Sequence, residues 1–270
     1  MHSFDGADGA EPNGLVQGTD GNFYGTTYTG GDIANQPLGT VFKITPSGTL
    51  TTLHDFNGAD GANPAAGLVQ GTNGNFYGTT SVTFFEITPS GTLTTLHSFN
   101  GTDGSGNSAA GMVQGADGNF YGITKVGGAS GYGTVFKITP TGALTLLHSF
   151  DEADGQDAGP ALVQDTNGNF YGTTALGGAS DHGTVFSLVA GLGPFVETLP
   201  TSGTVGAAVM ILGTNLTGAT AVTFDGTAAK FTVASSSLIT TTVPTGASTG
   251  EVKVITPNGT LSSNVSFLVP

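Results

Sequence analysis

Residues 22–27 read Asn-Phe-Tyr-Gly-Thr-Thr, and this phrase decides the fold because it returns three more times. The later copies begin at Asn75, Asn119 and Asn169, and Ile123 replaces a threonine in the third copy. Self-similarity at a period of about 50 residues indicates a repeat architecture in which each copy is one supersecondary unit. The sequence therefore predicts four equivalent units in the first part of the chain.

Two further phrases accompany these copies and supply more strands. Gly-Thr-Val-Phe-Lys-Ile-Thr-Pro occupies residues 39–46 and 133–140, is shortened at 84–89, and is altered at 183–188. Leu-Thr-Thr-Leu-His-x-Phe occupies 50–56 and 93–99, with a close variant at 144–150.

The first copy illustrates the expected strands and turns. Asp-Gly and Ser-Gly pairs separate its apolar runs, and such pairs adopt the positive φ that tight hairpins need. We expect strands at 15–17, 23–28, 40–44 and 49–54. A four-stranded antiparallel meander repeated at this period is typical of a propeller blade. The second copy departs from the others, since it lacks the Gly-Gly loop between its second and third strands.

The two ends of the repeat region predict how it is arranged. The fourth copy stops after its third strand at Leu188, without the Leu-His-x-Phe strand of the other copies. Met1-His2-Ser3-Phe4 matches that missing phrase in register. Pairing of this segment with the last blade would remove exposed sheet edges, which otherwise invite aggregation. We therefore predict a four-bladed β-propeller closed by the N-terminal strand; the alternative is an eight-bladed ring shared by two chains.

Composition excludes several classes of protein. Gly contributes 46 residues of 270 and only 9% of residues are charged, which favours short strands and turns over helices. The formal charge of −14 would repel nucleic acid, so we expect no nucleic-acid partner. The apolar runs are short and interrupted by glycine, which predicts no membrane insertion. Cysteine is absent, so stability must come from sheet packing.

The repeat phrases resemble the Gloeobacter/Verrucomicrobia-type tandem repeat of large bacterial surface proteins. The resemblance spans about residues 1 to 190 and is carried by the phrases quoted above. It implies a propeller-like fold and an extracellular or cell-surface location, and it implies no particular activity.

A different pattern begins after Ala190, and we predict a domain boundary there. Residues 209–216, 222–224 and 252–259 form alternating strands bounded by Gly, Asn and Pro, which favour a β-sandwich. Residues 194–270 resemble an IPT/TIG domain, which implies an immunoglobulin-like sandwich. We therefore divide the chain into a repeat domain, 1–190, and an immunoglobulin-like domain, 191–270.

Recurring acidic residues are the candidate metal ligands. Each lies in the loop after an outer strand and is followed by glycine, and the four residues are Asp8, Asp60, Asp103 and Asp154. Their oxygen atoms could bind calcium. An Asx-turn that orders the loop is the alternative, because the full ligand spacing of a calcium loop is missing. We expect no organic cofactor.

Recurring histidines and aromatic pairs are assigned structural roles. The histidines are His2, His54, His97 and His148, on the expected outer strand, where we expect hydrogen bonds between blades. The pairs are Phe23-Tyr24, Phe76-Tyr77, Phe120-Tyr121 and Phe170-Tyr171, which we expect to pack between blades. His182 beside Asp181 has no accompanying nucleophile and is weak evidence of catalysis.

These features predict a non-enzymatic extracellular or cell-surface scaffold or adhesion module, whose copies self-associate into a homopolymer. A protein or carbohydrate surface is a further expected partner. A carbohydrate-binding module is the alternative, and a propeller-based polysaccharide hydrolase or lyase comes third. Fold by itself cannot choose among these functions.

Overall fold

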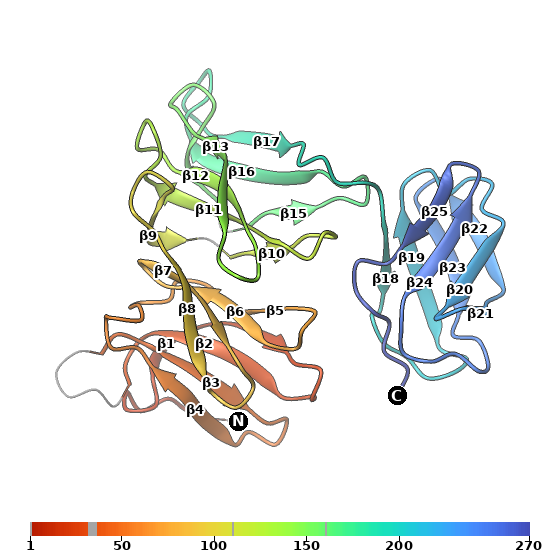
Figure 1. The fold of residues 1–270 in the computed structure, drawn as a ribbon, viewed down its shortest axis with the longest axis horizontal. Helices are drawn as coiled ribbons and strands as arrows, with labels where there is room; N and C mark the ends of the chain where they lie inside the picture. The colour runs from red at the N-terminus through yellow and green to blue at the C-terminus, as the bar shows by residue number, and fades with distance from the viewer. Residues whose placement is uncertain (1, 32–36, 110, 160) are drawn as a thin grey trace. The chain divides into compact units, whose positions relative to one another are not determined.

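The structure, a computed structural model, describes residues 2–31, 37–109, 111–159 and 161–270. Over these residues the regular elements are 25 strands arranged in six sheets, without a helix, and Figure 1 shows them as separate sheets. This confirms the all-β prediction. No helix in the described residues could span a membrane.

The repeat region forms four sheets, one for each copy of the repeat. The first contains β1 (Ala10–Gln17), β2 (Phe23–Thr29), β3 (Thr40–Ile44) and β4 (Leu50–Asp55). The second contains β5 (Val69–Gln70), β6 (Phe76–Thr79), β7 (Thr83–Ile87) and β8 (Leu93–Ser98). The third contains β9 (Ser105–Ala109), β10 (Val113–Gln114), β11 (Phe120–Val126), β12 (Thr134–Ile138) and β13 (Leu144–Ser149). The fourth contains β14 (Gln156–Ala158), β15 (Val163–Gln164), β16 (Phe170–Leu176) and β17 (Thr184–Leu188).

The predicted closure of the ring is not found. β17 pairs with β16, and residues 2–4 form no strand. Those residues instead lie against the first sheet, where the His2 ring bonds Asp8 and the Phe4 ring packs edge-on against Phe42. The structure therefore does not show the predicted four-bladed ring closed by the N-terminal strand. Met1 lies outside the described residues.

Aromatic side chains pack successive sheets together. The Tyr24 ring stacks on Phe76 of the next sheet at 3.9 Å between centroids, and the Tyr77 ring packs at a tilt on Phe120 of the sheet after that, at 4.3 Å. All four rings are fully buried, within clusters that join the first sheet to the second and the second to the third. The predicted packing of the aromatic pairs between blades is confirmed for these two contacts.

The glycine of each Phe-Tyr-Gly phrase makes room for this packing. A Cβ atom on Gly78 would lie 2.5 Å from the tip of the Phe85 ring on the neighbouring strand. Only a residue without a side chain allows that ring to lie flat across the strand, so the phrase requires glycine at this position.

The remaining strands form a sandwich of two four-stranded sheets. One sheet contains β18 (Val196–Leu199), β19 (Ala208–Gly213), β22 (Phe231–Ser235) and β23 (Leu238–Thr242). The other contains β20 (Ala221–Phe224), β21 (Thr227–Ala228), β24 (Val252–Thr256) and β25 (Gly259–Ser262). Inward-facing residues from both sheets, among them Ile211, Ile239 and Val254, form its core.

The chain separates into two compact units. The first comprises Met1–Gln114, Gly118–Val163 and Gly172–Phe186, and the second comprises Gly115–Asp117, Gln164–Tyr171 and Ser187–Pro270. The predicted boundary after residue 190 stays a prediction.

Candidate functional site

The recurring histidines and aspartates form one pair in each repeat. The histidine Nε2 lies within hydrogen-bond distance of an aspartate Oδ2 six residues later in the chain. The pairs are His2–Asp8 at 2.6 Å, His54–Asp60 at 2.9 Å, His97–Asp103 at 2.9 Å and His148–Asp154 at 2.7 Å. Each hydrogen bond therefore joins the recurring histidine to the loop aspartate that the sequence suggested as a calcium ligand.

The other oxygen of each aspartate also serves the loop. In the second repeat the Asp60 Oδ1 accepts a hydrogen bond from the backbone N–H of Asn57, at 3.1 Å. The Asn57 side chain in turn accepts one from the backbone N–H of Ala59, at 3.0 Å. This is the reciprocal pattern of an Asx-turn. In the first repeat burial raises the pKa of Asp8, but hydrogen bonds from Asp5 and His2 outweigh it and hold that pKa below its usual value.

Each loop is also attached to the sheet that follows it. The backbone carbonyl of Asp60 accepts a hydrogen bond from the Thr83 hydroxyl at 3.0 Å, and Thr83 is bonded to Thr80 at 2.7 Å. Both threonines are buried. The carbonyls of Asp103 and Asp154 accept equivalent bonds from threonines of the third and fourth sheets at 3.0 Å. We call this contact of loop aspartate and threonine the inter-sheet latch.

The geometry leaves the calcium assignment a prediction. Asp8, Asp60, Asp103 and Asp154 each bond a histidine and a backbone N–H of their own loop. Within residues 2–31, 37–109, 111–159 and 161–270, no three His, Cys, Asp or Glu side chains gather closely enough to hold a metal ion. His182 bonds the carbonyl of Ser180, and Asp181 accepts from the backbone of Gly177.

A second set of polar groups, which the sequence analysis missed, lies at the edge of the aromatic stacks. In the first sheet the Tyr24 hydroxyl donates to Asp20 at 2.8 Å. In the second sheet asparagine replaces that aspartate, and the Tyr77 hydroxyl donates to Glu86 at 2.7 Å. Burial, together with the neighbouring carboxylate, raises the pKa of Tyr24 and of Tyr77 to about 12.

The sequence did contain a signal for these tyrosine–carboxylate pairs. Where the turn has Asp20, the third strand has Lys43; where the turn has Asn73, that strand has Glu86. The acidic group thus moves from the turn to the strand while one carboxylate stays beside each tyrosine. Nearby Lys43 also helps to lower the pKa of Asp20, against the effect of burial.

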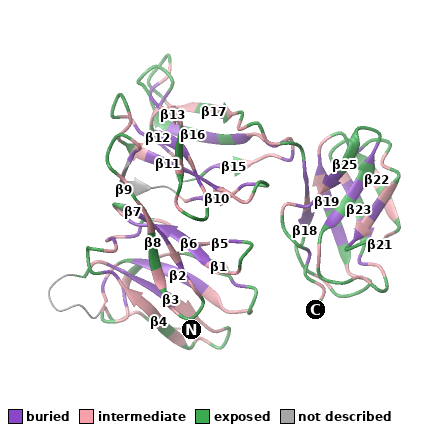
Figure 2. Cartoon of the chain, viewed as in Figure 1, coloured by how far each residue is buried: buried purple, intermediate pink, exposed green. Residues whose placement is uncertain are grey.

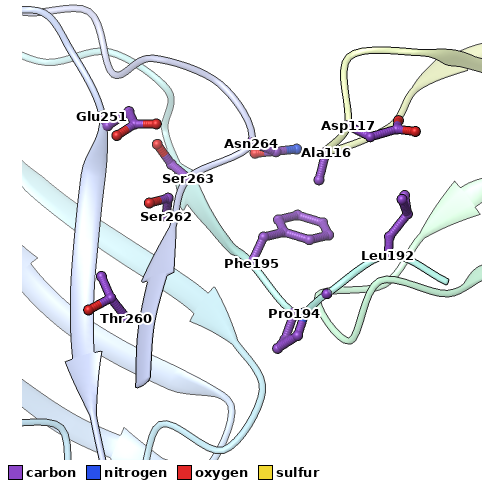
Figure 3. A pocket seen from close by; sticks show the side chains of 11 residues that line it. Ala116, Asp117, Leu192, Pro194, Phe195, Glu251, Thr260, Ser262, Ser263 and Asn264 are labelled. Atoms are coloured by element: carbon purple, nitrogen blue, oxygen red, sulfur yellow. The ribbon is translucent and has the colours of Figure 1, made fainter. Parts of the chain in front are cut away.

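The second unit contains a hollow of about 350 Å³, which Figure 3 shows from close by. Phe195 and Asn264 line it, and the buried Oδ1 of Asn264 has no hydrogen-bond partner among the residues that the structure describes. Glu251, also in the lining, forms an ion pair with Lys253 at 3.0 Å. The lining thus includes the amide of Asn264 and two carboxylates, Asp117 and the paired Glu251.

Comparison with known families identifies both parts of the chain. The Gloeobacter/Verrucomicrobia repeat matches residues 1–83 and 80–210, and the IPT/TIG domain matches residues 195–269. No curated protein is significantly similar to the chain.

Several solved structures are similar in fold, all at low identity. A putative gluconolactonase is 17% identical with a TM-score of 0.42, over 66% of this chain and 60% of that one. Streptogramin B lyase is 11% identical with a TM-score of 0.46, over 95% and 83%. An extracellular domain of a putative hybrid two-component system from Bacteroides thetaiotaomicron is 12% identical with a TM-score of 0.45, over 100% and 40%. This chain thus spans less than two thirds of the gluconolactonase and of the sensor domain.

These neighbours correct one prediction from the sequence. The chain was predicted to be non-enzymatic; that exclusion is corrected, since the similar solved structures include a putative gluconolactonase and streptogramin B lyase. At such identities and TM-scores they assign no activity to this chain.

Proposed function

Because this chain belongs to the Gloeobacter/Verrucomicrobia repeat family and carries an IPT/TIG domain over residues 195–269, we propose that it is an extracellular or cell-surface scaffold and adhesion module. In this proposal copies of the chain associate with one another, and the assembled surface contacts proteins or carbohydrates outside the cell. The location rests on the character of the two families.

The inter-sheet latch is the observation that carries this proposal. The histidines, loop aspartates and latch threonines, which recur in all four repeats, are hydrogen-bonded within the repeat or to the next sheet. A polar framework that joins each unit to its neighbour is the design expected of a stacked repeat, in which stability is passed from one interface to the next. Such a framework suits a module that presents surfaces and resists being pulled apart.

Microspheres coated with the full chain test the proposal directly. Spheres coated with albumin are the control, and parallel samples are applied to immobilised polysaccharides. Clustering of the coated spheres with one another, beyond the albumin control, is the expected result. Retention on polysaccharide without clustering would replace the scaffold by a carbohydrate-binding module. Release of reducing sugar or of an unsaturated product would instead favour a hydrolase or a lyase.

The location is tested on intact cells of the source organism. An antibody against the chain should label unpermeabilised cells, and protease added outside should remove the label. A label that appears only after permeabilisation would overturn the extracellular assignment.

A further inference from the structure

The fourth sheet has an exposed apolar face, whereas the equivalent faces of the first three sheets are buried. Val185 in β17 is 79% exposed, whereas the residues at the same repeat position in the first three sheets are at most 1% exposed. Those residues are Val41, Phe84 and Val135. Tyr171 is 38% exposed, and its counterparts Tyr24, Tyr77 and Tyr121 are buried. Figure 2 shows β17 without the buried colour that marks the inner strands.

β17 also lacks a partner strand on its outer side. In the first three sheets the third strand pairs with a fourth, and the histidine of that strand lies opposite the residue equivalent to Val185. These register pairs are Val41–His54, Phe84–His97 and Val135–His148. Among the described strands β17 pairs with β16 alone. An unpaired edge of this kind is a template for a strand from elsewhere.

Residues 2–4 have the opposite deficiency, because they resemble the end of an outer strand and pair with no sheet among the described residues. His2 and Phe4 meet edge-to-face at 5.3 Å between centroids, the same separation as between His54 and Phe56. Phe4 meets Phe42 at 5.2 Å, as Phe56 meets Phe85 at 5.3 Å. The segment therefore lies on the first sheet as the end of an outer strand lies on the sheet that follows it.

The two deficiencies are complementary, and we infer that the last sheet of one copy receives the N-terminal segment of a second copy. The repeat register places His2 of the second copy opposite Val185, and Ser3 opposite Thr184. The first sheet of the second copy then stacks on the fourth sheet of the first. This inference rests on the proposed self-association and names the surfaces that carry it.

The opposite end of the stack fits this contact. Leu15 on the first sheet is 58% exposed, whereas its counterparts Leu68, Met112 and Leu162 are at most 8% exposed. Stacking on the fourth sheet of another copy would bury Leu15 as its three counterparts are buried. Residues 184–189 and 2–4 contain no carboxylate, so these two segments bring no negative charge into the contact. A head-to-tail contact of this kind is heterologous and repeats into a ring or a filament.

Engineered disulfides test the register, because the native chain contains no cysteine. One chain carries Ser3→Cys and a second carries Thr184→Cys; after mixing and mild oxidation, a covalent heterodimer is expected. The matched control is a single chain with Thr83→Cys and Ser98→Cys, a register pair within the second sheet that should close internally. A control disulfide without any heterodimer would overturn the inference. So would an internal disulfide in a chain that carries both Ser3→Cys and Thr184→Cys, formed at concentrations where the chain is monomeric.

A second variant keeps the test independent of the latch threonine. Val185→Asp places a carboxylate in the proposed contact without disturbing a core, and Val205→Asp, at a residue 50% exposed in the sandwich, is its control. Light scattering should show association weakened on the order of tenfold or more by Val185→Asp alone, since burying an unpaired charge is costly. If both variants associate like the native chain, the surfaces named here are wrong while the scaffold proposal stands. If the native chain stays monomeric and its microspheres do not cluster, the scaffold proposal falls with them.

Discussion

Replacing Thr83 with valine removes one hydroxyl from the inter-sheet latch at almost constant side-chain volume. Thr83 is 3% exposed, and its hydroxyl bonds the Asp60 carbonyl at 3.0 Å and the Thr80 hydroxyl at 2.7 Å. A buried polar group left without a partner costs about 1–3 kcal/mol. The Asp60 carbonyl keeps a longer bond from Thr95 at 3.4 Å, and Thr80 still accepts from the backbone of Thr83. We therefore expect a loss of about 1–2 kcal/mol in the free energy of unfolding.

The repeat supplies its own control for this substitution. Thr184 bonds the Asp154 carbonyl at 3.0 Å and Thr174 at 2.9 Å, but it is partly exposed. Water can replace the hydroxyl there, so Thr184→Val should cost less than about 1 kcal/mol. The two variants thus remove the same bonds from different surroundings.

Tyrosine fluorescence during urea unfolding measures the difference. The chain has six tyrosines and no tryptophan, and every tyrosine lies between residues 24 and 171, so the signal reports the repeat region. The midpoint should fall for Thr83→Val without a change in the denaturant dependence. Equal losses for the two variants would refute the argument that burial makes the latch stabilising.

Further predictions follow from other contacts. Gly122→Ala would place a Cβ 2.5 Å from the Phe136 ring and should destabilise the repeat region by about 1–3 kcal/mol, whereas Gly14→Ala, with open space around it, should be neutral in the same urea assay. The pKa of Tyr24 and of Tyr77 is raised to about 12, so their contribution to stability is complete below about pH 10 and is lost as the pH rises toward 12. The tyrosinate absorbance of these two residues should therefore appear only as the pH approaches 12, and its loss in Tyr24→Phe and Tyr77→Phe variants would identify it; no loss of absorbance in that range would contradict the prediction. Burial raises the pKa of Glu86, but hydrogen bonds from Asn75 and Tyr77 outweigh it and lower that pKa, so the stabilising effect of the Glu86 carboxylate should disappear as the pH falls below 4.5. Urea midpoints measured between pH 7 and pH 3 should therefore depend less on pH in Glu86→Gln than in the native chain. EDTA should leave the melting temperature nearly unchanged. If EDTA instead lowers it strongly, and Asp→Asn changes at residues 8, 60, 103 and 154 abolish this effect, those residues are calcium ligands.

The recurring tyrosine–carboxylate pair is recognised only when the repeats are compared with one another in the structure. Read separately, Asp20 and Glu86 are acids in different places, one in a turn and one in a strand. Both accept a hydrogen bond from the tyrosine of their own sheet. The sequence shows that the repeat position of Lys43 in the first copy is occupied by Glu86 in the second. Explaining this change required knowing which residues face one another across two strands.

The sequence by itself determined the repeating unit. Turn signals and alternating apolar residues placed three strands of the first copy close to β2, β3 and β4, because hairpin geometry depends on residues near one another in the chain. The first predicted strand, 15–17, covers only the end of β1, which begins at Ala10. The Phe-Tyr-Gly phrase likewise predicted aromatic packing between sheets, which the stacking of Tyr24 on Phe76 confirms.

Only the tertiary structure decided how the stack ends and what its polar residues do. The phrase at residues 1–4 matched the missing outer strand, yet residues 2–4 form no strand, and their side chains contact Asp8 in the loop before β1 and Phe42 in the first sheet. Pairing with β17 depends on the summed geometry of four sheets, which no local phrase encodes. The recurring aspartates show the same division: their spacing is a property of the chain, but the histidine and backbone groups that occupy their oxygens are set by the folded loop.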